Sequence, residues 1–530
     1  MNTILLIQIA IIILVSMLLQ RLSLSLGAPS LLALLVVGLL CGNYGVISLG
    51  YIGYPFAQRS CEAALIFIMF YGGFDTRWRS AKKVLAEASL LSTLGVIVTA
   101  ALIALFCHYV IRWAWGESCI MGAILSSTDA ASVFTILKAK RLNLKDNLTS
   151  LIEVESGSND PISHMLTLIV ISVISGTATP GSAVLHVFLE IFLGLGLGIL
   201  IAKGTAFALR HLSISEGLIS MLFFAIAILA YAIPDAIGGN GFLSVYVVGL
   251  LLGKESFSGK KAIVHFFEGI TSLMEMVLFF VLGALARPAS LVYSILPALA
   301  VFAFLLLVAR PAAVNLLLLP MRKYGLAHRT LLSFAGLRGA AAIVFAVVAV
   351  NNLSPQNDII NIVFCIVVLS MAIQGSFLPL CARKLDLIDN TSSNMLSFNE
   401  FAEEDQLQFG KFEITENSKW LGRTVGEAGL PEGLSIAMVI RGAETLVPHS
   451  DLVLNEGDTV ITLTRPFDEV GAMIKEKVVK PDSRRVGRPI KDHPGRSKIL
   501  LVKRDDKSII PDDNTILLAG DHLVILELQN

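Results

Sequence analysis

Apolar segments of membrane-spanning length recur along most of the chain, and this repetition constrains the fold more than any other feature. A helix needs about 20 apolar residues to cross the hydrocarbon core of a bilayer. We expect thirteen such spans, at 4–20, 28–43, 60–75, 85–111, 117–138, 148–175, 182–202, 212–233, 238–253, 264–286, 291–319, 329–351 and 358–382. The sequence therefore predicts an all-α polytopic membrane protein over residues 1–385.

The composition agrees with a membrane protein. Of the 530 residues, 55% are hydrophobic and 15% are charged, whereas an average soluble domain has about 25% charged residues. The formal net charge is zero, which argues against nucleic-acid binding. All six cysteines lie in the apolar part and none has CxxC spacing, so we interpret them as packing residues.

The charged loops orient the spans. The basic residues in loops that follow even-numbered spans are Arg59, Arg112 and Arg287 alone. Loops after odd-numbered spans contain clusters of basic residues, such as those at 77–83 and 138–145. By the positive-inside rule, the N-terminus is outside and the charged C-terminal tail is cytoplasmic.

The tail contains an internal repeat. A polar linker is expected at 386–402, followed by a β-rich region at 403–530. Arg441 and Gly457-Asp458 correspond to Arg504 and Gly520-Asp521, each offset by 63 residues. The shared Gly-Asp precedes an alternating strand in each unit and suits a tight turn. The sequence predicts two related strand-turn-strand units in a cytoplasmic α+β domain.

The two tail units resemble known regulatory modules. The first, at 403–480, is similar to the RCK-C (TrkA-C) subdomain of potassium-transport regulators. The second, at 481–530, resembles a shortened copy of it or the small domain of CorC-type proteins. The resemblance implies either a ligand-sensing or dimerising module or a passive dimerisation and stability domain, and both interpretations stay open.

Two carboxylates lie within apolar spans. Asp129 follows Ser126-Ser127-Thr128 in the fifth span, and Asp160 follows Glu155-Ser156-Gly157-Ser158-Asn159 in the sixth. An ionisable group at membrane depth is costly and marks an ion or proton pathway. Asp160 could exchange a proton for a monovalent cation, with Thr128 and Ser156 completing an oxygen shell. The Ser-Ser-Thr-Asp run is poor helix material and predicts an unwound fifth span. Pro161 could also break the sixth.

Two arginines within the spans require partners. Arg338, in Gly336-Leu337-Arg338-Gly339, lies in the twelfth span, and Arg310 lies in the eleventh. A lone buried charge is expensive, so we expect Glu155 to form a structural ion pair with Arg338. Arg310 has no partner that the sequence assigns.

These motifs, taken in order from Thr128-Asp129 through Glu155-Pro161 to Gly336-Gly339, resemble the NhaP-type branch of monovalent cation/proton antiporters. The resemblance implies inverted repeats, broken helices and a homodimer in the bacterial inner membrane, working by an elevator-like movement. It implies that Asp160 binds the ion and the proton, that Asp129, Thr128 and Ser156 form or polarise the site, and that Asn159 holds the unwound helices. No cofactor is expected.

The pattern Asn159-Asp160 resembles that of electroneutral members, which implies one cation exchanged for one proton. The RCK-C-like tail resembles that of the potassium/proton subgroup, so potassium is favoured and sodium is the alternative. A regulated potassium channel is a more distant alternative, because no TVGYG-like filter is present in the sequence.

His164 is interpreted as a packing residue, with a proton relay as the alternative. The glycine run 194–198 favours helix packing over a nucleotide loop.

Overall fold

The structure is a computed structural model of the whole chain, and it divides into two compact units, Met1–Ser393 and Asn394–Asn530. We describe each unit by itself. The described residues are 10, 13–15, 18, 30–45, 52–76, 78–140, 142, 144–211, 216–255, 257, 260–321, 323–353, 355–389, 408–415, 418, 420–430, 434–442, 444–464, 472–479, 483, 486–490, 497–504, 507–509, 511 and 515–528. Most of the expected first span, 4–20, lies outside them.

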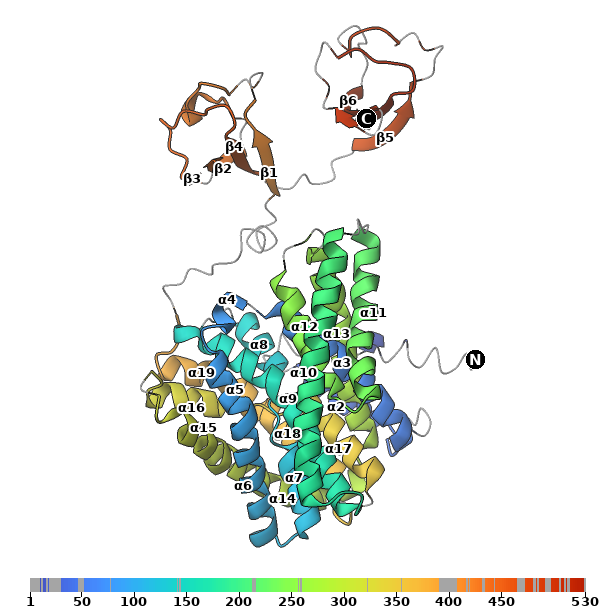
Figure 1. Cartoon of the computed structure of the whole chain (residues 1–530), viewed down its shortest axis with the longest axis vertical. Helices are drawn as coiled ribbons and strands as arrows, with labels where there is room; N and C mark the ends of the chain where they lie inside the picture. Colours follow the sequence, from blue (N-terminus) through green and yellow to red (C-terminus); the bar gives the residue numbers. More distant parts are fainter. Residues whose placement is uncertain are drawn as a thin grey trace. The chain divides into compact units, whose positions relative to one another are not determined.

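The first unit is helical (Figure 1). Its helices, in chain order, are α2 Ser30–Cys41, α3 Tyr54–Asp75, α4 Trp78–Ala81, α5 Leu85–Leu90, α6 Val96–Tyr109, α7 Trp115–Ile124, α8 Ala130–Ala139, α9 Leu148–Ile174, α10 Pro180–His211, α11 Glu216–Ala236, α12 Gly241–Lys254, α13 Lys260–Leu285, α14 Pro288–Phe304, α15 Arg310–Leu318, α16 Leu326–Phe334, α17 Ala340–Asn352, α18 Ile359–Leu369 and α19 Ser376–Lys384. Short 3₁₀ or π segments join some of them: π-helices η1 Leu91–Gly95, η3 Leu305–Ala309 and η4 Ser370–Gly375, and the 3₁₀ turn η2 Lys145–Asn147.

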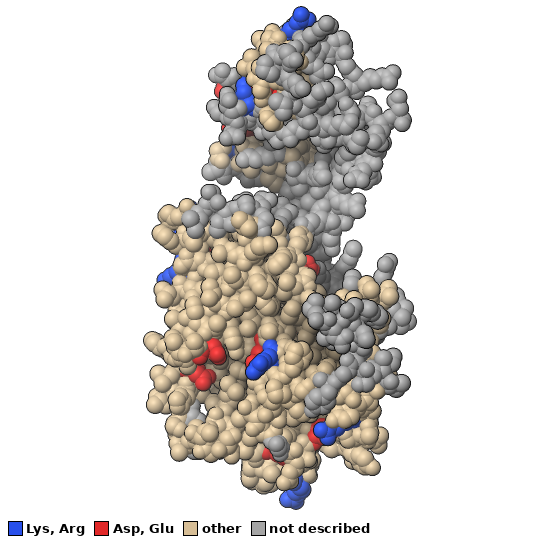
Figure 2. Space-filling model, turned by 90° about the vertical axis from the view of Figure 1, so that its right-hand side faces the viewer, with Lys and Arg blue, Asp and Glu red and all other residues tan. Residues whose placement is uncertain are grey.

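Six of the described helical stretches are long and apolar enough to cross a bilayer. They are Leu85–Tyr109, Leu185–His211, Leu218–Ala236, Ala262–Leu285, Pro288–Leu318 and Ile359–Lys384. Each coincides with an expected span. Large apolar side chains such as Phe192 and Leu296 are about three quarters exposed. Figure 2 shows one face of this unit on which charged side chains are few, as expected for a surface that meets lipid.

Two of the expected spans are divided, and a third is continuous where a break was considered. The fifth is divided into α7 and α8, as expected, and the twelfth is divided into α16 and α17, which the sequence analysis did not anticipate. The sixth is the continuous helix α9, with Pro161 inside it. The expectation that Pro161 breaks this span was therefore wrong.

Close helix packing depends on glycine. A Cβ atom at Gly249 of α12 would lie 2.3 Å from the carbonyl oxygen of Phe70 in α3. In the glycine run of α10, a Cβ at Gly194 would lie 2.7 Å from the carbonyl oxygen of Asn240, and one at Gly198 would lie 3.0 Å from that of Ser244. Backbones approach this closely where small residues line the interface, so the packing interpretation of the glycine run is confirmed.

The second unit contains two four-stranded antiparallel sheets with equivalent topology. The first has the order β1-β4-β2-β3 and the second β5-β8-β6-β7. Their strands are β1 Gln408–Glu413, β2 Leu434–Arg441, β3 Glu444–Leu446, β4 Thr459–Thr464, β5 Ala472–Val478, β6 Ser497–Arg504, β7 Lys507–Ile509 and β8 His522–Leu528. The register shifts in β2 between Ile436 and Met438, and in β6 between Ile499 and Leu501. The repeat seen in the sequence is therefore a structural repeat.

An arginine-aspartate clamp recurs in both sheets. Arg441 donates from Nε and Nη2 to the two carboxylate oxygens of Asp458, each at 2.8 Å. Arg504 contacts Asp521 in the same way, at 2.8 and 2.7 Å. Gly457 and Gly520, which precede the aspartates, have φ angles of 80° and 91°, a left-handed conformation that favours glycine. The clamp ties the final strand of each unit to the strand beside it.

The clamp predicts how acid affects the tail. Hydrogen bonding to Arg441 and Arg504 lowers the pKa values of Asp458 and Asp521. A lowered folded-state pKa stabilises the fold above the unfolded value of about 3.9, and this contribution is lost as pH falls through the folded pKa. We expect amide hydrogen exchange in β4 and β8 to be slow and even from pH 7 to about 5 and to accelerate below about 4, after correction for intrinsic rates.

The repeat supplies an internal control for this prediction. Asp458→Asn should accelerate exchange in β4 at neutral pH and leave β8 unchanged, because only the first clamp loses its ionised partner. An equal change in both strands, or no change in either, would contradict the role assigned to the clamp.

Candidate ion-binding site

Two interrupted helices meet inside the first unit. Residues 125–129 separate α7 from α8, and residues 335–339 separate α16 from α17. The backbone N–H of Asp129 donates to the carbonyl oxygen of Leu337 at 2.9 Å, so the two non-helical segments lie against each other. The expected interruption before Asp129 is confirmed. Non-helical backbone at membrane depth is tolerated only where protein or a polar cavity satisfies it.

Asp129 caps the N-terminus of α8. Its Oδ1 accepts from the backbone N–H of Ser132 at 3.2 Å, and its Oδ2 accepts from the Ser132 hydroxyl at 2.7 Å. A carboxylate at this position satisfies a free helical N–H and favours the positive end of the helix. A Cβ atom on Gly339 would lie only 1.7 Å from Asp129 Oδ2. Glycine at 339 is therefore required for the two segments to cross.

The two non-helical segments, 125–129 and 335–339, form what we call the crossing. Arg338 lies fully buried there. Its Nη1 donates to the carbonyl oxygen of Ser126 at 3.2 Å and also to that of Ser127. Its backbone N–H donates to the Ser370 hydroxyl at 2.9 Å. Arginine thus satisfies carbonyl groups that the interruption of the fifth span leaves without helical partners.

Two further residues, which the sequence analysis missed, support the crossing from η4. The Ser370 hydroxyl donates to Gln374 Oε1 at 2.7 Å, and Gln374 Nε2 donates to the carbonyl oxygen of Phe334 at 2.9 Å. Ser370 and Gln374 are polar residues within a strongly apolar span, and this was the available signal. Short π-helical segments such as η4 frequently occur at functional sites.

Helix α9 presents a row of polar side chains to the first interruption. Asn159 Nδ2 donates to Thr128 Oγ1 at 2.6 Å, and Asn159 Oδ1 accepts from the Thr128 backbone N–H at 3.3 Å. The hydroxyls of Thr128 and Ser156 lie 2.8 Å apart. These contacts fix the unwound segment against α9. The structure therefore brings together Thr128, Ser156 and Asn159, as the sequence suggested.

Asp160 lies beside the same segment and contacts a residue that the sequence analysis did not assign. The Ser127 hydroxyl donates to Asp160 Oδ1. One turn further along α9, the hydroxyls of Ser163 and Ser126 lie 2.9 Å apart. Asp129 and Arg338 are the charged groups whose fields act on Asp160. The arrangement places one acidic side chain against a hydroxyl group of the unwound segment, which is an environment able to accept a proton or a small cation.

The predicted Glu155–Arg338 pair was wrong. Glu155 Oε1 accepts from Arg310 Nη2 instead, and both side chains are buried. Arg310 is the first residue of α15, directly after η3. Its side chain packs against the crossing, since a Cβ on Gly336 would lie 2.9 Å from its Nε. Arg338 is directed to the carbonyl oxygens of the fifth span. The physical reasoning that a buried charge needs a partner was sound, but the sequence does not determine which arginine reaches Glu155.

His164 contacts aromatic rings. Its ring centroid lies 4.8 Å from that of Phe242 and 5.6 Å from that of Phe345, so its surroundings are those of a packing residue. Among the residues that the structure describes, no group of three or more His, Cys, Asp or Glu side chains is arranged to hold a metal ion.

The Glu155–Arg310 pair gives a first prediction for the site. Removing one partner of a buried pair costs about 3–5 kcal/mol because the other charge is left alone. We expect Glu155→Gln and Arg310→Gln each to lower the unfolding temperature of the purified protein strongly. In a double-mutant cycle, Glu155→Gln should couple to Arg310→Gln more strongly than to Arg338→Gln. Stronger coupling to Arg338 would contradict the assignment.

The contact of Gly339 with Asp129 gives a second prediction. Overpacking a close contact typically costs about 1–3 kcal/mol, and the Asp129 carboxylate that an added Cβ would meet is held in place by Ser132. We expect Gly339→Ala to destabilise the protein by at least that amount. The matched control is Gly196→Ala in α10, because a Cβ at Gly196 meets nothing within 4 Å. Equal thermal stability of the two variants would show that the crossing can accommodate a methyl group at position 339, and it would contradict the prediction.

Comparisons with known proteins agree with this architecture. Residues 9–384 match the family described as "Sodium/hydrogen exchanger, transmembrane". Residues 411–466 and 475–526 each match the TrkA-C domain. The sodium proton antiporter MjNhaP1 of Methanocaldococcus jannaschii has a similar fold, with a TM-score of 0.63 at 21% identity, covering 72% of this chain and 98% of that one.

Similar sequences carry antiporter names. A K(+)/H(+) antiporter NhaP2 of Shewanella oneidensis is 34% identical over 464 residues, 86% of this chain and 80% of the relative. The K(+)/H(+) antiporter NhaP of Alkalimonas amylolytica is 31% identical over 87% of this chain and 81% of its own length. The Na(+)/H(+) antiporter ApNhaP of Aphanothece halophytica is 26% identical over 68% and 70%. The chain belongs to the sodium/hydrogen exchanger family of cation/proton antiporters and carries a TrkA-C tail.

Proposed function

We propose that this protein exchanges potassium ions for protons across a membrane and that Asp160 is the group for which the two ions compete. The observation that carries the proposal is the placement of Asp160 on the continuous helix α9, opposite the hydroxyl of Ser127 in the unwound segment. A carboxylate in this position must lose its proton to bind a cation and regain it to release the cation. Exchange follows because both ions occupy one site in turn.

The remaining polar residues divide into two roles. The Ser127 hydroxyl contacts Asp160 and is the best candidate to share the cation. Thr128, Ser156 and Asn159 bond one another, so we assign them chiefly to holding the unwound segment. Thr128 and Ser156 can still offer oxygen lone pairs to a cation at Asp160, as the sequence suggested. Asp129, as the cap of α8, fixes the segment, and its negative charge makes the electrostatic potential at the site more favourable to a cation.

Potassium is the favoured cation. The relatives named K(+)/H(+) antiporters are 31–34% identical over 86–87% of this chain, whereas the relative named a Na(+)/H(+) antiporter is 26% identical over 68%. The alignments with the potassium-named relatives are longer than the 385-residue membrane part, so they include part of the tail. Sodium exchange by the same mechanism is the alternative.

The exchange should be electroneutral. Position 159, next to Asp160, is an asparagine whose amide is engaged with Thr128. An amide does not titrate, so one carboxylate remains to carry one cation or one proton. One potassium ion then moves for each proton, and no net charge crosses the membrane.

The surrounding architecture supports a wider proposal. We assign 1–385 to a transmembrane exchanger domain, 386–402 to a linker, and 403–530 to two TrkA-C-like regulatory units. The boundary between the two units lies before β5, and not at residue 480 as the sequence suggested, because β5 pairs with β8 of the second sheet. The loop charges favour an outside N-terminus and a cytoplasmic tail. We further propose a homodimer in a bacterial inner membrane, in which the helices of the crossing move as a body against the rest.

The central prediction concerns Asp160→Asn. Everted vesicles from cells without their own antiporters would carry an imposed pH gradient, and dissipation would be recorded on adding potassium, sodium or lithium. We expect potassium to dissipate the gradient in wild-type vesicles and Asp160→Asn to reduce the signal to the background of empty vesicles. Expression and thermal unfolding of the variant serve as controls for folding. A response to sodium alone would overturn the potassium assignment.

The electroneutral exchange gives a separate prediction. The initial rate of potassium-driven proton movement in proteoliposomes should be independent of an imposed membrane potential, because no net charge moves. The potential would be set without potassium gradients, for example with a permeant anion. A rate that rises or falls steeply with potential would contradict one-for-one exchange and leave antiport itself intact.

A further inference from the structure

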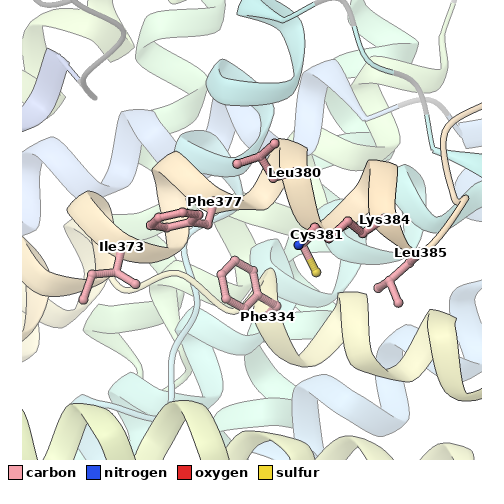
Figure 3. Close-up of a pocket in the computed structure, with 7 residues that line it drawn as sticks. All are labelled: Phe334, Ile373, Phe377, Leu380, Cys381, Lys384 and Leu385. Atoms are coloured by element: carbon pink, nitrogen blue, oxygen red, sulfur yellow. The ribbon is translucent and has the colours of Figure 1, made fainter.

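A cavity of about 470 Å³ opens between the last helix of the first unit and α16, and the function proposed above does not use it. Its volume is within the range of small-molecule sites, about 300–1,000 Å³. Figure 3 shows the Phe334 side chain reaching from α16 toward the helix that carries the other lining residues. Those are Ile373, Phe377, Leu380, Cys381 and Lys384, with Leu385 directly after the helix.

The lining changes in character along its length. From Ile373 to Cys381 the side chains are apolar or weakly polar, whereas Lys384 lies at the end of the helix beside Arg383. Phe377 and Leu380 are 54% and 49% exposed, and they belong to a stretch, Ile359–Lys384, that is long and apolar enough to cross a bilayer. The exposed apolar side of the cavity therefore meets lipid, and its cationic end lies at the end of the membrane-spanning stretch.

We propose that this cavity binds one anionic phospholipid, with an acyl chain between α16 and α19 and the headgroup phosphate on Lys384 and Arg383. Both basic side chains are exposed, and no ion pair of either is recorded among the described residues. A basic group at the end of a spanning helix attracts anionic headgroups. The apolar part excludes a free phosphate ion as the natural occupant, because an ion gains nothing from the groove.

The cavity wall is continuous with the crossing. Phe334 is the residue whose carbonyl oxygen accepts from Gln374, and Gln374 also accepts from Ser370, which in turn accepts from the Arg338 backbone N–H. Ile373 precedes Gln374 in η4. A lipid held against Phe334 and Ile373 thus packs on the segment that fixes the break between α16 and α17. Occupancy should stabilise the membrane unit.

The test is lipid retention by the full-length protein. Wild-type protein would be purified in phosphatidylcholine and detergent, titrated with phosphatidylglycerol and analysed by native mass spectrometry. We expect one phosphatidylglycerol to be retained in preference to phosphatidylcholine. Lys384→Gln should weaken retention about fivefold, and Cys381→Trp should weaken it by filling the groove. The matched control is Lys203→Gln, an exposed lysine late in α10 that does not line the cavity.

A second readout distinguishes lipid from a protein occupant. Alkylation of Cys381 by a membrane-permeant maleimide, measured against a Cys381→Ala background, should slow in vesicles containing phosphatidylglycerol and remain fast in pure phosphatidylcholine. Equal protection in both lipids would mean that the cavity is covered, by protein or by bulk lipid, without selection for an anionic headgroup, and would overturn the proposal. Equal retention in wild type, Lys384→Gln and Cys381→Trp would also overturn it. Each variant is checked by thermal unfolding, and neither readout depends on transport.

Discussion

The structure depends on how two interrupted helices satisfy their backbone in an interior with little water. A carbonyl group that has lost its helical partner costs free energy unless another donor replaces water. Arg338 supplies that donor to Ser126 and Ser127, and Gln374 supplies one to Phe334. The backbone at each break is thus satisfied by a side chain from another span: Arg338 of the twelfth span serves the fifth, and Gln374 of the thirteenth serves the twelfth. The two breaks are therefore energetically coupled, through these side chains and through the hydrogen bond from the Asp129 N–H to the Leu337 carbonyl oxygen.

The same arrangement creates the chemistry of the site. The interruptions place two helix N-termini, those of α8 and α17, at the crossing, and Asp129 caps one of them. Helix α9 runs past the first interruption without a break, so Asp160 is held by a regular helix while its partner Ser127 lies in irregular backbone. Glu155 and Arg310 compensate each other nearby. The buried charge of Glu155 is thus compensated by Arg310 and not by the site, which leaves Asp160 as the carboxylate that can hold either ion.

Much of this was predictable from residue chemistry, and the failures have a common cause. The Ser126–Asp129 run predicted its interruption because short polar residues favour caps over helix interiors. The repeat of Arg441 and Asp458 at 504 and 521 predicted two related units. The second was expected to be a shortened copy or a CorC-like domain, but it forms a four-stranded sheet like the first and matches the TrkA-C domain. The break at 335–339 was missed, since Leu337 and its small neighbours are equally compatible with a closely packed helix. Pro161 was overvalued because a helix can continue through one lost hydrogen bond. Glu155 was paired with the wrong arginine, since the distance between spans is a tertiary property.

The most direct test of the account is the competition between the two ions at Asp160. The apparent Michaelis constant for potassium would be measured in everted vesicles across pH from about 6 to 9, with the maximal rate determined at each point. If one proton and one cation share the carboxylate, the constant rises with acidity, approaching about tenfold per pH unit below the pKa of the site, while the maximal rate changes little. A constant that stays fixed across this range, with only the maximal rate changing, would mean that proton and cation bind at separate places and would contradict the central claim.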